Sequence, residues 1–175
     1  MTTTGTTVPT PRLTGERADL QQTLASHRHF LRFTVRGLTD EQATSRPTAS
    51  ELTLAGIVKH VAHTERHWAQ FAVRGPEAFA GAWSPEAWAA EWRLQPGETL
   101  AGVLAEYEEI ARATDELIAT IDLDLTHPLP PAPWFEKGAS RSARRTFLHL
   151  IAETSQHAGH ADILRESIDG QKTMG

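Results

Sequence analysis

The 175-residue chain contains no cysteine. This absence excludes a disulfide-stapled scaffold, an iron–sulfur cluster, a zinc finger built on thiolates and an enzyme with its own cysteine nucleophile. The chain also lacks a run of 18 apolar residues, so no segment is expected to cross a membrane. Its threonine-rich start has neither the basic residues nor the apolar middle of a signal peptide. We therefore expect a soluble, cytoplasmic protein.

Neither sign of charge dominates the chain. Seventeen lysines and arginines stand against 22 aspartates and glutamates, which gives a net charge of -5. The chain therefore lacks the clustered positive charge on which nucleic-acid binding depends. Hydrophobic residues make up 39% and charged residues 22%, which is typical of a globular domain. Histidine and tryptophan are the two abundant residue types, with nine histidines and five tryptophans in the chain.

Apolar residues recur at three- and four-residue steps in four long segments, which predicts four amphipathic helices. These segments cover residues 13–36, a stretch from Ser50 or Thr53 to 73, residues 98–121, and a stretch from Ser140 or Ser142 to 170. Proline-rich stretches at 76–97 and 122–140 separate them, and the first of these holds a short helix that starts at Ser84 and carries Trp88 and Trp92. The sequence predicts an all-α fold, a four-helix bundle over residues 13–170 with long irregular crossover connections. A disordered tail is expected at 1–12 and a short C-terminal tail at 171–175.

The last long helix carries a ladder of polar side chains on its inward face. At about 100° per residue, Glu153, His157 and His160 lie side by side, with His157 near the middle of the apolar arc. Two imidazoles and a carboxylate that face one space can hold a metal ion. The alternative is that these side chains are polar core residues that satisfy one another by hydrogen bonds.

The second long helix offers His60, His63 and His67. The spacing places His63 away from the apolar stripe, where solvent would cover it, and leaves His60 and His67 equally placed at the border of the stripe. Glu65 lies within the stripe. It is expected either to orient a metal ligand or to form a salt bridge where two helices cross. His149 is expected on the outer flank of the last helix.

Three arginines, Arg141, Arg144 and Arg145, cluster where the last helix begins. They could hold an anionic substrate, although such a cluster is more often the solvated start of a helix.

Three stretches of the chain resemble a known family. The segment LAGIVKHVAHTERHW, residues 54–68, resembles the second-helix signature of the DinB/YfiT-like superfamily. Residues 92–100, WRLQPGETL, and residues 149–170, HLIAETSQHAGHADILRESIDG, resemble its actinobacterial branch, the mini-circle-protein or mycothiol-transferase-like group. The resemblance implies a four-helix bundle that holds one divalent metal ion through one histidine of the second helix and two ligands of the fourth.

The resemblance also suggests which residues bind the metal. It places the second-helix ligand at His60 and the distal ligand at His160. The remaining ligand of many relatives falls on Gln156, a poor ligand, so His157 is chosen because it faces inward, and Glu153 is held in reserve. Zinc is the favoured ion, although nickel or ferrous iron fits the same ligands.

The function that the resemblance implies is a thiol-dependent transferase. A low-molecular-weight thiol such as mycothiol would be deprotonated by the metal, and its thiolate would attack a small electrophile. Glu65 and Glu153 are the candidate catalytic carboxylates, and Arg141 and Arg145 would hold carboxylates of the thiol or its acceptor. The alternative function is a non-catalytic, stress-associated metal-binding bundle, and a homodimer is compatible with either. In a third interpretation the histidines serve only as polar packing.

Overall fold

The computed structural model describes residues 13–81 and 84–173, so the expected tail at 1–12 lies outside the described residues. Helices dominate this part of the chain, which confirms the all-α expectation. They are α1 (Gly15–Thr34), α2 (Asp40–Thr44), α3 (Leu54–Arg74), the 3-10 helix η1 (Gly75–Phe79), α4 (Pro85–Glu91), α5 (Leu100–Thr120) and α6 (Ala143–Asp169). A search of the described residues finds no helix that combines the length and apolar character needed to span a membrane.

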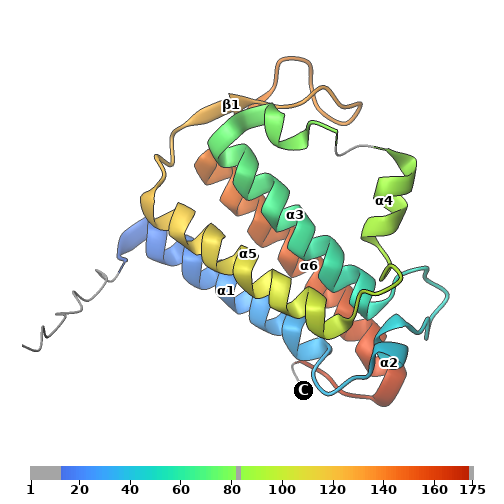
Figure 1. Ribbon diagram of the computed structural model, residues 1–175. Coiled ribbons are helices and arrows are strands. Elements are labelled where there is room, and N and C mark those ends of the chain that lie inside the picture. The colour runs from blue at the N-terminus through green and yellow to red at the C-terminus, as the bar shows by residue number, and fades with distance from the viewer. Residues whose placement is uncertain (1–12, 82–83, 174–175) are drawn as a thin grey trace, which may run out of the picture.

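The four long helices α1, α3, α5 and α6 lie side by side (Figure 1). Helix α1 packs mainly on α6, and α3 packs on both α5 and α6. Their apolar faces meet in two buried clusters, one around Ile57 and Val58 and the other around Leu24, Phe147 and Leu150. Helix α3 thus has neighbours on two sides, which explains why most of its residues are buried.

Hydrogen bonds to helix-capping side chains show at which residue α3, α4 and α6 begin. The hydroxyl of Thr53 accepts a hydrogen bond from the backbone N–H of Gly56, so Thr53 rather than Ser50 caps α3. In the same way Ser142, not Ser140, caps α6. Ser84 caps the short helix α4, as its sequence predicts.

The second connection is more regular than the sequence suggests. Strand β1 (Thr126–Pro128) pairs antiparallel with β2 (Ser140–Ser142), and the backbone of Leu129 extends the pairing by donating to Ala139. The expectation of an irregular loop over 122–140 is therefore wrong at both ends of that segment. The two strands are only three residues long and carry no apolar alternation, so the periodicity could not reveal them. This hairpin crosses the end of α3 next to η1 (Figure 1).

Candidate metal centre

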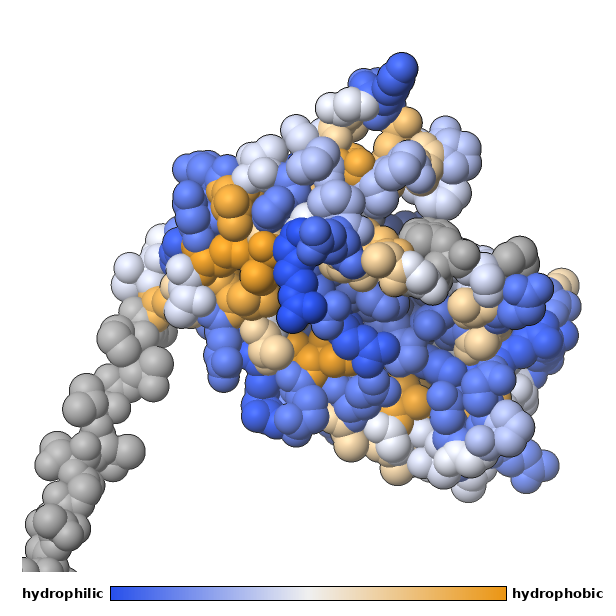
Figure 2. Space-filling view, turned by 45° about the horizontal axis from the view of Figure 1, so that its top comes forward, coloured by the Kyte–Doolittle hydropathy of each residue, from blue (hydrophilic) through white to orange (hydrophobic). Residues whose placement is uncertain are grey.

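A cavity of about 820 Å³ opens between α3 and α6. Helix α4, η1 and the proline-rich tip of the hairpin, residues 130–135, close its sides. This end of the molecule comes forward in Figure 2, where apolar and polar side chains lie interspersed. Five tryptophan and phenylalanine side chains line the cavity together with four histidines, so it is an aromatic pocket that also carries polar side chains. Such a pocket is the usual form of a small-molecule site.

Three metal-ligating side chains meet beside this cavity, and two of them, His60 and Glu153, line it. One donor atom each from His60, Glu153 and His157 lies within 4.8 Å of the other two. Glu153 and His157 are neighbours on one face of α6 because they are four residues apart, and His157 Nε2 lies 3.6 Å from Glu153 Oε2. His60 approaches them from α3, and its ring centre lies 5.0 Å from that of His157.

His60 sits in an aromatic box. Its ring stacks on Trp92 at 3.7 Å between centres and meets Trp88 edge-on at 5.8 Å. Burial, followed by the proximity of His157, lowers the pKa of His60 to about 4. The imidazole is therefore neutral at pH 7, which is the form that binds a metal ion.

Glu153 is ionised in this setting. A hydrogen bond with His157 lowers the pKa of the Glu153 carboxyl, against the opposing effect of burial. Two imidazoles and a carboxylate also form the donor set of known catalytic zinc sites and of ferrous iron sites. The residues present therefore fit a divalent ion.

His160, the distal ligand that the resemblance suggests, is not among the three converging donors. Its Nδ1 lies 3.5 Å from Nδ1 of His157, on the side of the ring that faces away from the Glu153 contact. A group in that place can fix the orientation and tautomer of His157. Gln156 is exposed and takes no part.

Glu65 lies outside the site. Its carboxylate is fully buried and accepts two hydrogen bonds from Arg28, at 2.6 and 3.0 Å. Arg28 also binds Asp115 at 2.8 Å, so the cluster joins α3 to α1 and α5. Glu65 does not line the cavity, because five residues after His60 it points to a different side of α3. The salt bridge expected of Glu65 at a helix crossing is therefore present, and its carboxylate faces Arg28 rather than the cavity.

The three arginines separate in the structure. Arg144 pairs with Glu16 and Asp124, away from the cavity. Arg145 is exposed and does not line it. Only Arg141 reaches the wall of the cavity, where its guanidinium lies 4.7 Å from the ring centre of Trp68.

His149 lines the cavity and does not lie on the outer flank of α6, where its spacing predicts it. The ring of His149 meets Trp68 edge-on at 4.9 Å, and its Nε2 lies 3.7 Å from Oε1 of Glu153. Burial and the nearby Arg141 lower its pKa to about 4, so it too is neutral at pH 7. The sequence pattern does contain this information, because residues 149, 153 and 157 are spaced by four and therefore share one face of the helix.

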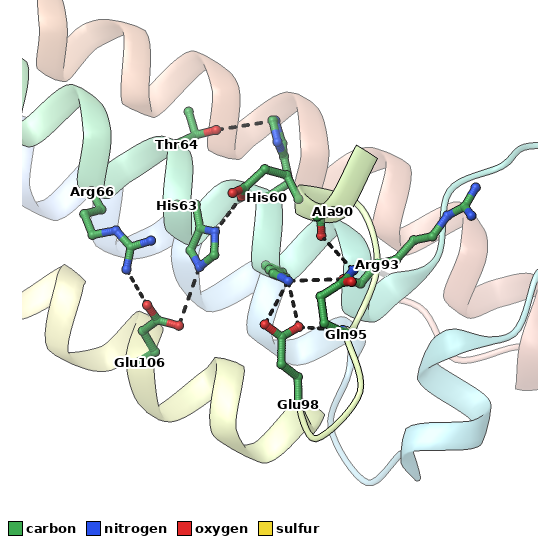
Figure 3. Close-up of polar contacts among 11 residues, drawn as sticks. His60, His63, Thr64, Arg66, Ala90, Arg93, Gln95, Glu98 and Glu106 are labelled. Atoms are coloured by element: carbon green, nitrogen blue, oxygen red, sulfur yellow. Dashed lines mark hydrogen bonds and ion pairs between the residues drawn. The ribbon is translucent and has the colours of Figure 1, made fainter. Parts of the chain in front are cut away.

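His63, expected in solvent, fastens α4 to the long helices. Its Nδ1 lies 2.5 Å from Glu91 at the end of α4, and its Nε2 lies 3.5 Å from Glu106 on α5. Lys59 holds the chain just beyond α4 by donating to the carbonyl of Arg93 and to the carboxylate of Glu98 (Figure 3). These contacts keep Trp88 and Trp92 over His60.

Gly56 allows that segment to come close, which gives a testable prediction. A Cβ atom on Gly56 would lie 2.0 Å from the carbonyl oxygen of Trp92. Gly56→Ala is therefore expected to displace Trp92 from His60 and to lower the free energy of unfolding by about 2 kcal/mol. Tryptophan fluorescence and urea denaturation measure the two effects.

The matched control for that variant is Gly159→Ala, because a Cβ atom at this helical glycine meets nothing within 4 Å. This change is expected to leave the fluorescence unchanged and to stabilise α6 slightly. Equal behaviour of the two variants would contradict the close approach.

Comparison with known proteins identifies the family of this chain. A family model of mycothiol S-transferases matches residues 19–170. The chain belongs to the mycothiol S-transferase family, which is DinB/YfiT-like. A solved structure, described as a conserved protein from Enterococcus faecalis, superposes with a TM-score of 0.62 at 13% sequence identity. It covers 91% of this chain and all of its own, and at that identity it shows a shared fold alone. A search of curated proteins found no match.

Proposed function

We propose that this protein is a divalent-metal-dependent S-transferase that joins a low-molecular-weight thiol, mycothiol in the first place, to a small electrophile. The observation that carries the proposal is the meeting of His60, Glu153 and His157 beside a cavity of about 820 Å³, which His60 and Glu153 line. Family membership supplies the thiol, and a chain without cysteine must take its sulfur from a cosubstrate. Within the DinB/YfiT-like four-helix bundle, residues 13–170 would act as one domain.

His60, Glu153 and His157 would hold the ion, with zinc as the favoured metal. A divalent ion held by these residues would favour the thiolate form of a thiol at neutral pH, because a bound cation lowers the pKa of a thiol. His160 would orient His157, and His149 would orient Glu153, each through the contact already described. Three protein ligands leave a position open for a substrate.

The aromatic wall would protect the nucleophile from water. Trp88 and Trp92 cover His60 from the α4 side, and Lys59 and His63 hold that cover in place. A drier site strengthens the charge interactions within it. We expect the protein to act in the cytoplasm, since a thiol cosubstrate needs a reducing compartment.

The test is thiol consumption by untagged, zinc-loaded protein with mycothiol and 1-chloro-2,4-dinitrobenzene. We expect metal-dependent consumption above the uncatalysed rate, with at least about a hundredfold loss in His157→Ala. His29→Ala is the matched control, because His29 is exposed on α1 and does not line the cavity.

Equal rates in the two histidine variants would contradict the assignment of the site. If mycothiol, bacillithiol and glutathione all fail across a broad panel of electrophiles, the non-catalytic metal-binding bundle becomes the better account.

A further inference from the structure

Arg141 stands out among the cations near the cavity. Its guanidinium lies 4.7 Å from the ring centre of Trp68 and 5.4 Å from that of Phe135. Its Nη1 is buried without a hydrogen-bond partner, and none of the carboxylates in residues 13–81 and 84–173 forms an ion pair with it. Arg28 and Arg144, by contrast, each bind two carboxylates. A half-buried guanidinium without a carboxylate partner is uncommon, because a buried polar group that lacks a hydrogen bond costs free energy.

Aromatic rings and a second arginine lie near Arg141. Burial, followed by the charge of Arg145, lowers the pKa of Arg141, and the weaker attraction of the Glu153 carboxylate raises it. His67 and His149 also line this part of the cavity. The remaining wall here is mostly apolar and aromatic, with Trp68 and Phe135 under the guanidinium.

We propose that this end of the cavity binds the carboxylate of an aromatic acceptor substrate, with Arg141 as its anchor and the aromatic wall around its ring. The inference rests on the proposed function and names the acceptor class for it. Trp68 follows His60 by eight residues, which is about 12 Å along α3, so an acceptor held here can reach toward the donor cluster. The planar guanidinium can donate two parallel hydrogen bonds to a carboxylate.

The first test is binding without a thiol. Calorimetric titration of zinc-loaded protein with 4-chloro-3-nitrobenzoate and with 4-chloro-3-nitrobenzamide compares an anion with its neutral isostere. We expect the benzoate to bind about tenfold tighter or more, as one charge-assisted contact predicts. Arg141→Gln is expected to abolish this preference, and Arg141→Lys to keep part of it.

Arg74→Gln is the matched control, because it removes the same charge from an exposed position at the end of α3 that does not line the cavity. It is expected to keep the preference of the wild type. Equal binding of benzoate and benzamide by the wild type overturns the inference. So does a preference that survives Arg141→Gln, because the carboxylate would then bind elsewhere, for example at the metal.

The second test separates this inference from the proposed function. In the transfer reaction the thiolate forms a C–S bond at the chlorinated ring carbon, chloride leaves with the electron pair, and the thiol proton passes to the buffer. We expect the benzoate to be preferred in kcat/KM once each rate is divided by its uncatalysed rate, and Arg141→Gln to remove that preference. If the benzoate and the benzamide are transferred at equal rates, each divided by its uncatalysed rate, the transferase is supported and the anion site is overturned. Charge-dependent binding without transfer would support the anion site and contradict the transferase.

Discussion

Glu153→Ala is expected to weaken zinc binding by roughly a thousandfold, because it removes one of three protein donors. His160→Ala is expected to weaken it only about 10- to 100-fold, the usual effect of losing a group that orients a ligand. The difference follows from the geometry, since Glu153 shares the 4.8 Å cluster whereas His160 contacts only the far side of His157. Competition with a chromophoric chelator measures both affinities.

Glu166→Ala is the matched control for Glu153→Ala, because Glu166 is an exposed glutamate on the same helix. It is expected to bind zinc as tightly as the wild type. The opposite order, with His160→Ala losing the ion and Glu153→Ala keeping it, would restore the ligand set that the resemblance suggests.

Glu65→Ala is expected to destabilise the fold rather than impair the site. It leaves the guanidinium of Arg28 buried with one carboxylate in place of two, and breaking a buried ion pair costs about 3 kcal/mol or more. Urea denaturation of metal-free protein, followed by circular dichroism, measures the loss. Zinc affinity should remain within about threefold of the wild type, because Glu65 does not line the cavity.

A double variant tests the cause of that loss. Arg28→Met with Glu65→Leu replaces the buried charges by apolar side chains, and it is expected to recover most of the stability. If Glu65→Ala unfolds at the same urea concentration as the wild type but loses zinc, then Glu65 acts on the metal and the structural interpretation is wrong.

The helices of this protein could be predicted because their signals are local. Apolar spacing marks all four long helices, and the hydroxyl caps at Thr53, Ser84 and Ser142 are visible in the sequence. The five-residue helix α2 and the three-residue strands are too short to show a period, so they were missed.

The site could be predicted only in part, because its parts meet across the fold. The inward position of His157 is a local property of its helix, whereas apolar spacing leaves His60 and His67 equally placed and only the family resemblance chooses His60. The place of His63 depends on Glu91 and Glu106, which come from two other helices. Arg28 decides the role of Glu65 from 37 positions earlier in the chain, and no periodicity within α3 could reveal that partner.

The most direct test of the metal centre is a crystal structure of untagged protein grown with zinc, with anomalous diffraction recorded at the zinc edge. The predicted result is one anomalous peak per chain within bonding distance of His60, Glu153 and His157, at about 2.0–2.2 Å from each donor atom. A map without a peak at the cavity wall would contradict the account. So would a peak bonded to His160 in place of Glu153.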